Sequence, residues 1–492
     1  MDELLQSNNP PLHFECIHLE SLIGDSHVFL SGLKDQITQT CAVLEGLLDE
    51  ERSVERLVQS CKTILSPIRN IPEDRVHRIL VTCLDIDKPE RKDSLDGKSP
   101  PLVLSQVCRD WRSVTLSTSQ LWSSISLDFD RYRNEVACLY RLQMYILRSG
   151  MHDITLSIRS TKGLSTKNPV TPILFSSAAR WVDLHIAIPY LSLHALSAVR
   201  GSLHRLTRLR VEFTTEPRMP LFPPSKPIFR AFEYAPLLRS VSINSVCSAV
   251  EQVSLPWPQL TQYTGNDWTS TYIDILKLAP DMASMSLQCD DDCGFDIVLP
   301  SIPFRHHGLR RLHVYEEAKK PRSEIRSEGG ITHVLSHVEL PALESLSMAY
   351  RHPNIWIPSS LHLGNLSSLS IDASFIIPTG AQADLLSLLR TTPSLSHLSM
   401  SMSMAPEEDV ILVGLNISIN PDVVPGLKSL AFRFINISPG LSSVFVDMVE
   451  SRRPGLESLR LSVPLVMLPP PSALVDRWAG LCDGNFVTYG VE

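Results

Sequence analysis

The chain has 492 residues, of which 43% are apolar and 20% charged, and its formal net charge is −8. This length exceeds one ordinary domain, so we expect several domains or an array of repeats. The apolar content excludes a disordered chain, and the mildly acidic balance does not suit a protein that binds nucleic acid through a basic face. No apolar run approaches the ~20 residues that span a bilayer, so no membrane partner is expected.

The N-terminal residues, MDELLQSNNPPLHFE, lack the basic start and apolar core of a secretory signal. We therefore expect a cytoplasmic or nuclear protein whose ten cysteines are reduced thiols. The sequons at Asn365, Asn416 and Asn436 then carry no glycan.

The first region is predicted to be a flexible arm over residues 1–26, followed by a long helix over residues 27–69. The helix shows a heptad pattern in which all a and d positions except Thr40 and Glu51 are apolar. The a positions are Leu30, Ile37, Leu44, Glu51, Val58 and Leu65, and the d positions are Leu33, Thr40, Leu47, Val54, Cys61 and Ile68. Pro67 disfavours helix at Ser66. The pattern predicts a coiled-coil face, which either binds a second copy or packs on its own chain.

Residues 70–127 are predicted to form a small helical module. Ile71-Pro72-Glu73-Asp74 indicates a helix start, because proline suits the first turn and acids suit the positive end of the helix dipole. A polar loop over residues 85–101 precedes a second helix that carries Trp111, and Trp122 follows it. The module is too short to hold a rich core alone. A linking helix is expected within residues 128–150.

The pattern L-x-x-L-x-L recurs through residues 151–463, with a mean spacing of about 28 residues. The clear copies begin at Leu206, Leu238, Met282, Leu309, Leu343, Leu366, Leu395, Leu427 and Leu456, and weaker copies begin at Trp181 and Leu260. This spacing is typical of leucine-rich repeats, whose strand–helix units must stack to bury their apolar sides. We expect an α/β solenoid with a curved parallel sheet and with helices and loops on its convex side. Residues 464–492, with Pro469-Pro470-Pro471 and Trp478, are expected to cap it.

The residues between the leucines of each strand should form the open face of the sheet. Most are serine, and a slip of one residue near Arg239 stays open. Basic and aromatic side chains suit a contact surface. The candidate substrate-binding residues are Arg208, Arg210, Arg311, His313, Tyr315, Arg433 and Arg460. The alternative is an ordinary solvated sheet face.

No motif for phosphate binding, a catalytic serine or a zinc protease occurs in the chain. The acid and thiol cluster at residues 289–293 lacks a second ligand pair at zinc-site spacing, and His306-His307 is interpreted as a loop feature. We therefore expect no metal, no cofactor and no catalytic residues, and we expect that the protein is not an enzyme.

Residues 71–127 resemble an F-box. The resemblance is carried by Ile71-Pro72-Glu73, by Val107-Cys108-Arg109-Asp110-Trp111-Arg112 and by Leu121-Trp122. The family usually begins with Leu-Pro where this chain has Ile71-Pro72, and the loop over residues 85–101 is an insertion. The order of heptad helix, F-box and irregular leucine-rich repeats is similar to that of F-box proteins of mushroom-type fungi.

The resemblance implies a substrate receptor of an SCF-type ubiquitin ligase, in which the F-box binds a Skp-type adaptor and through it a cullin, while the repeats bind a protein substrate. It implies adaptor contacts at Ile71, Pro72, Ile79, Leu80, Val107, Cys108, Trp111, Leu121 and Trp122. Large amphipathic rings such as tryptophan often anchor interfaces. The alternatives are that these residues pack the module itself, and that the chain is a repeat scaffold with a vestigial F-box.

Overall fold

The computed structural model describes residues 5–6, 9–86, 93–131, 135–164, 168–214, 229–244, 249–266, 269–290, 303–317, 335, 337–350, 363–373, 377–402, 409–434, 442–463, 474–482 and 486–491. Its contacts divide the chain into two units, which are described separately. The first comprises Met1–Ile79 and Cys108–Val114, and the second comprises Leu80–Val107 and Thr115–Glu492.

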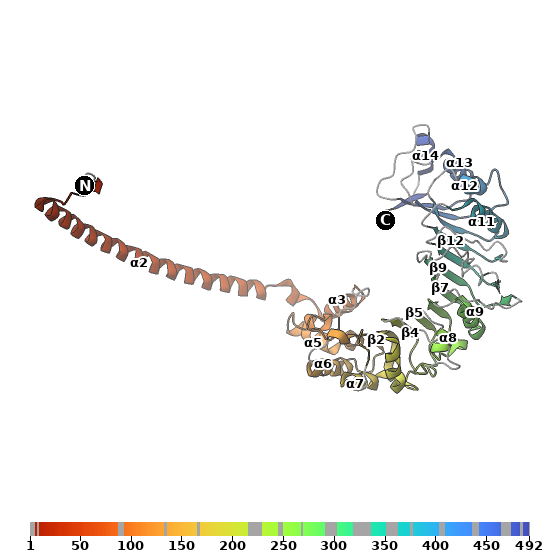
Figure 1. Ribbon diagram of the computed structural model, residues 1–492, viewed down its shortest axis with the longest axis horizontal. Coiled ribbons are helices and arrows are strands. Elements are labelled where there is room, and N and C mark those ends of the chain that lie inside the picture. The colour runs from red at the N-terminus through yellow and green to blue at the C-terminus, as the bar shows by residue number, and fades with distance from the viewer. Residues whose placement is uncertain are drawn as a thin grey trace. The chain divides into compact units, whose positions relative to one another are not determined.

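The first unit is dominated by α2 (His13–Ile64), a helix of 52 residues with no buried residue (Figure 1). It begins earlier than predicted, so residues 13–26 belong to the helix and not to a flexible arm. A capping interaction explains the early start, because the Leu12 N–H donates to the Glu15 carboxylate at 2.7 Å. Once a first turn is held, each further residue adds a hydrogen bond at low cost. The helix ends at Ile64, so the predicted end at residue 69 is too late, and Ile68 lies in the turn that begins at Pro67.

A short 3₁₀ turn, η1 (Pro67–Asn70), leads to α3 (Glu73–Ile86). The other helices of the predicted module are α4 (Pro100–Leu104), α5 (Arg109–Ser117) and η2 (Ser119–Trp122). Part of the predicted polar loop, residues 87–92, lies outside the described residues. The part that follows is not a solvated loop: Asp93, Ser94 and Leu95 are buried, and the Ser94 N–H donates to the Ser126 carbonyl at 2.8 Å.

The second unit contains a sheet of fourteen parallel strands, counted among the described residues, which pair in chain order. The strands are β1 (Ser124–Asp128), β2 (Ile154–Arg159), β3 (Trp181–Ile188), β4 (Arg208–Phe213), β5 (Ser240–Asn244), β6 (Gln262–Gly265), β7 (Ser284–Asp290), β9 (Arg311–Glu317), β11 (Ser345–Tyr350), β12 (Ser368–Ala373), β13 (His397–Met402), β14 (Ser429–Phe434), β15 (Ser458–Val463) and β16 (Val487–Val491). A separate pair joins β8 (Phe304–Arg305) to β10 (Val338–Glu339).

Helices follow most strands and cover the convex side of this sheet, as Figure 1 shows. They are α6 (Glu135–Arg148), α7 (Val170–Ser176), α8 (Ala249–Gln252), α9 (Thr269–Leu278), α11 (Thr379–Thr391), α12 (Asp409–Leu415), α13 (Ser443–Arg452) and α14 (Val475–Cys482), with 3₁₀ turns η3 (Phe129–Arg131), η4 (Ala178–Arg180), η5 (Tyr190–Val199) and η6 (Trp257–Gln259). The predicted α/β solenoid of leucine-rich-repeat type is therefore confirmed.

The core of the solenoid consists of the repeated leucines. Leu369, Leu398, Leu430 and Leu459 pair in register on four successive strands, and all are buried. Each leucine therefore packs between its equivalents in the neighbouring repeats, which is why one repeat alone has no core.

The array begins before the predicted boundary at residue 151. Ser124 of β1 pairs with Thr155 of β2, so β1 is the first strand of the solenoid. The predicted linking helix, α6, connects these two parallel strands, as a helix of the array does. At the other end β16 adds the last strand and α14 precedes it, while residues 464–473 of the predicted cap, with the prolines at 469–471, lie outside the described residues.

None of the helices in the described ranges combines the length and the apolar character that crossing a membrane requires.

Candidate binding surfaces

The open face of the sheet carries the side chains that lie between the buried leucines. In β4, Arg208 and Arg210 are exposed, whereas Leu209 is buried. The same alternation holds in β5, where Val241 is buried, so the open question of a slip near Arg239 is settled against the slip. The predicted orientation of the strands is confirmed, and every candidate substrate-binding residue lies on this face.

The first charged group on the open face spans β2, β3 and β4. His185 Nε2 lies 3.1 Å from Glu212 Oε1, and its Nδ1 lies 3.4 Å from Ser157 Oγ. The hydrogen bond from His185 is the main cause that holds the pKa of Glu212 below its usual value, with Arg210 and Arg159 adding to it. In the same group, Arg208 Nη2 forms an ion pair with Asp183 Oδ2 at 3.2 Å. The group presents fixed charges of both signs, which suits recognition of a polar protein surface.

The second group is the column Arg311, His313 and Tyr315 on β9. Serines flank it on both sides, since Ser284 and Ser345 are in register with Arg311, and Ser286 and Ser347 are in register with His313. Desolvation lowers the pKa of His313. Long side chains between small ones remain accessible to a partner.

The third group lies on β12 to β15. Arg433 Nη1 is 3.3 Å from Asp372 Oδ2, and Ser401 Oγ donates to Asp372 Oδ1 at 2.7 Å. Arg460 is in register with Ala431 on one side and Thr488 on the other. The carboxylate of Asp372 thus fixes the guanidinium of Arg433 across β13.

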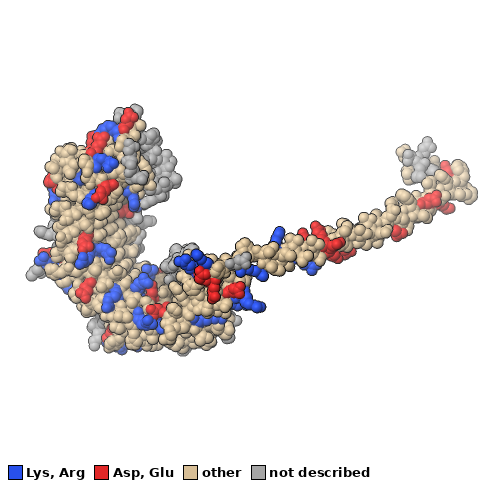
Figure 2. All heavy atoms as spheres, turned by 180° about the vertical axis from the view of Figure 1, so that it is seen from behind, with Lys and Arg blue, Asp and Glu red and all other residues tan. Residues whose placement is uncertain are grey.

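The seven candidate residues do not converge on one point. Three strands separate β4 from β9, and three separate β9 from β14. At ~4.8 Å between neighbouring strands, the three groups are about 20 Å apart. Figure 2 likewise shows basic and acidic side chains interspersed over the visible face of the solenoid. A client that contacts all three groups must therefore be long or globular.

Sequence reasoning missed His185 and Asp372 as members of these groups. Each occupies an outward position of a repeat strand, His185 in WVDLHI and Asp372 in LSSLSID. Aligning the strands in register places Arg210 beside His185 and Glu212 beside Ala187, so the contact between His185 and Glu212 is diagonal and does not follow from the register alone.

The predicted adaptor contacts divide into buried and accessible residues. Leu80, Leu121 and Trp122 are fully buried, and Trp111 is only 8% exposed. These four predictions are wrong as surface contacts, since the side chains pack the protein interior. For example, the Trp122 indole N–H donates to the Thr115 carbonyl at 2.9 Å, and its ring meets that of Tyr145 at 5.0 Å.

The remaining predicted contacts are accessible. Ile79 is 40% exposed and Val107 is 46% exposed. Pro72 is also exposed, while Ile71 and Cys108 are half-buried. An exposed isoleucine or valine alone is common on protein surfaces. The position of Ile79 on its helix is what makes it informative.

The apolar stripe of α3 is wider than its buried part. Val76 and Leu80 are buried, whereas Ile79 on α3 and Pro72, which directly precedes the helix, are exposed. Half of the stripe therefore packs inside the chain and half stays open to a partner. This arrangement fits helix-in-groove recognition.

Of the histidines weighed as metal ligands, His306 has a structural role. His306 is buried, with its Nε2 3.1 Å from the Ala279 carbonyl, and its Nδ1 accepts from the Leu309 N–H at 3.1 Å. Both ring nitrogens are thus used by the backbone. No cluster of potential metal ligands occurs within the described ranges, and residues 291–293 lie outside them.

A scan against protein-family models finds no match, and a search of curated proteins finds no relative. Among solved structures, one similar chain is that titled the crystal structure of the TLR13–ssRNA13 complex. The TM-score is 0.36 at 14% identity, and the match covers 63% of this chain and 42% of that chain. The chain thus spans less than half the length of that chain, and at this TM-score the likeness does not extend to function.

Proposed function

We propose that this protein is the substrate-binding subunit of an SCF-type ubiquitin ligase. The segment from Ile71 to Trp122 binds a Skp-type adaptor, and the open face of the solenoid binds a protein client. The chain performs no chemistry itself, but raises the effective concentration of its client near a ubiquitin-charged enzyme.

The open half of the α3 stripe carries this proposal. It follows Ile71-Pro72, the opening of the F-box-like motif, and it leaves Pro72 and Ile79 accessible while Val76 and Leu80 pack inside. The three charged groups on the sheet provide polar contacts for a client.

The adaptor contact can be tested by co-purification of the full chain with a Skp-type adaptor and a cullin. Ile79→Glu places a charge in the open half of the stripe, and we expect adaptor binding to fall roughly tenfold or more. His77→Glu is the matched control, since His77 is exposed on the polar side of α3. It should bind like the wild type.

Equal adaptor binding by the wild type and Ile79→Glu, both folded, would contradict the proposed contact. If the wild type binds neither adaptor nor cullin, the chain is instead a repeat scaffold. The three charged groups on the open face of the sheet favour this scaffold function, because protein binding at that face does not require an F-box.

A further inference from the structure

The apolar face of α2 is not covered within the described residues. Leu30, Ile37 and Leu44 at a positions are exposed, as are Leu33 and Leu47 at d positions. Figure 2 shows uncharged side chains along most of the visible side of this helix, interrupted by acidic and a few basic groups. Burial of apolar side chains away from water is favourable, so a face of this length favours a partner.

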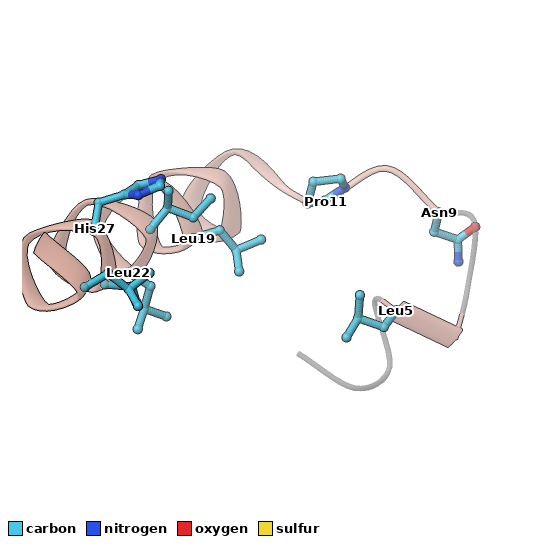
Figure 3. Close-up of a pocket in the computed structure, with 9 residues that line it drawn as sticks. Leu5, Asn9, Pro11, Leu19, Leu22 and His27 are labelled. Atoms are coloured by element: carbon cyan, nitrogen blue, oxygen red, sulfur yellow. The ribbon is translucent and has the colours of Figure 1, made fainter. Parts of the chain in front are cut away.

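A groove at the N-terminal end of α2 belongs to the same face (Figure 3). Its volume is about 590 Å³, and Leu5 and Pro11 lie across from the helix. The helix residues that line it are Leu19, Leu22, Ile23, Ser26, His27 and Leu30. With a at Leu30, these six occupy d, g, a, d, e and a positions, so none lies on the outer side of the heptad. The groove therefore lies on the side of α2 that the heptad pattern assigns to a partner helix.

We propose that α2 pairs with α2 of a second copy as an antiparallel coiled coil. Charge decides the orientation. In a parallel pair, Glu51 would meet the partner's Glu51 in the core, and Glu50 at g would face the partner's Glu55 at e. Both contacts place like charges together, one of them in a desolvated layer. An antiparallel pair removes both contacts.

The same charges select the register. In an antiparallel pair, a positions face d positions, and one register sets Glu51 opposite the partner's Leu33 and beside the partner's Lys34. Moving the register by one heptad shifts Lys34 about 10 Å along the axis and leaves Glu51 without this cation. The buried carboxylate thus gains a charged partner only in the first register.

The other polar core position also fits this register. Thr40 faces the partner's Leu44, and its hydroxyl already donates to the Gln36 carbonyl of its own helix at 2.8 Å. Thr40 therefore presents its methyl group to the leucine. At the g positions, Leu22, which lines the groove, faces the partner's Ile64, and Phe29 faces the partner's Leu57.

Residues 20–64 then overlap over about 68 Å, with the twofold axis near residue 42. Two native thiols report the orientation. Cys41 and Cys61 are both free and exposed. Cys41 lies at an e position close to the axis, on the same side as its equivalent, whereas Cys61 faces the partner's Ile23. In a parallel pair Cys61 would meet Cys61, and the two Cys41 side chains would lie on opposite sides.

The experiment combines light scattering of the full chain with a short bis-maleimide cross-linker and mass spectrometry of the linked peptides. We expect a dimer whose cross-link joins Cys41 to Cys41, and its loss in Cys41→Ser but not in Cys61→Ser. A monomeric full chain at about 10 µM, or a Cys61–Cys61 link, would overturn the proposal.

A charge exchange tests the register independently of cysteine chemistry. Lys34→Glu should weaken the dimer at least tenfold, and adding Glu51→Lys should restore it, because the pair is recreated with reversed signs. Arg52→Glu makes the same charge change at a b position and should leave the dimer intact. Failure of the double variant to recover would reject this register.

Discussion

Arg452 is buried at the end of α13 and is only 4% exposed. Its guanidinium donates to three carbonyls, those of Leu415 at 2.5 Å, Val423 at 2.7 Å and Val424 at 2.9 Å. Val424 has a φ of 39°, a conformation that a β-branched residue rarely adopts. Burial lowers the pKa of Arg452 to about 10, so it stays charged at neutral pH. The arginine thus holds a strained turn between two repeats.

Replacing Arg452 with Met should therefore destabilise the fold strongly. Methionine fills much of the volume but leaves three carbonyls without their donor, at a cost of about 3 kcal/mol in the free energy of unfolding. Urea unfolding measures it, and Arg460→Met, at an exposed arginine, serves as the control with a change below about 0.5 kcal/mol. Equal midpoints for the two variants would show that the carbonyls find other donors.

The pKa of Glu212 predicts an effect of pH on stability. Because the folded-state pKa lies below the usual value, the contribution of the ionised carboxylate is present above pH ~4.5 and is lost as the pH falls through the folded pKa. The melting temperature of the wild type should therefore exceed that of Glu212→Gln at pH 7, and the difference should shrink below pH 4.5. The His185→Ala variant should reduce the difference at pH 7, and a constant difference at all pH values would speak against the pair.

At the scale of one strand, the two sides of β13 should respond differently to truncation. Leu398 is 1% exposed between equivalent leucines of β12 and β14, so Leu398→Ala opens a cavity and should cost about 3 kcal/mol. Ser399 faces the open side and is half-buried. Ser399→Ala should change the free energy of unfolding by less than about 0.5 kcal/mol in the same denaturant titration. An equal loss in the free energy of unfolding for both variants would mean that the serines of the open face are also packed against other parts of the protein.

The repeat strands could be predicted because side chains in a strand alternate between the two faces of the sheet. Equivalent positions in successive repeats also carry the same kind of apolar residue. The module around Trp122 could not be divided into core and surface in this way. The α3 stripe holds both buried Leu80 and exposed Ile79 at adjacent positions. Periodicity shows which residues are apolar, but only the packing partners decide which of them are covered.

The early start of α2 was missed although Pro10 and Pro11 precede it, because its N-cap is Leu12 and not one of the polar residues that usually mark a helix start.

At the scale of the molecule, the predicted boundary at residue 151 was too late for a related reason. Residues 122–127, WSSISL, have the spacing of the weaker copy WVDLHI at Trp181, but they also fit the end of the helical module, and the pairing of β1 with β2 identifies this segment as the first strand. Terminal repeats depart from the consensus because one of their sides has no neighbour to match. The three charged groups belong to this scale as well, since each depends on residues of two or three strands that the register aligns.

The C-terminal end should control how unfolding spreads through the solenoid. Trp478 of α14 packs its ring 6.0 Å from that of Phe445 in α13, and its indole N–H donates to the hydroxyl of Tyr489 in β16 at 3.2 Å. Trp478→Ala should therefore cost about 3 kcal/mol at this end. Stability in a repeat array passes between neighbours, so the loss should fade with distance along the chain.

Hydrogen exchange on the full chain measures this gradient. We expect amide protection to fall most in β16 and β15 and to stay unchanged in β2 to β4. Arg477→Ala, which removes exposed ion pairs to Glu450 and Asp447 on α13, should have a much smaller effect. A loss of equal size in every strand would show instead that the whole sheet opens as one cooperative body, because neighbour coupling then exceeds the stability of each repeat.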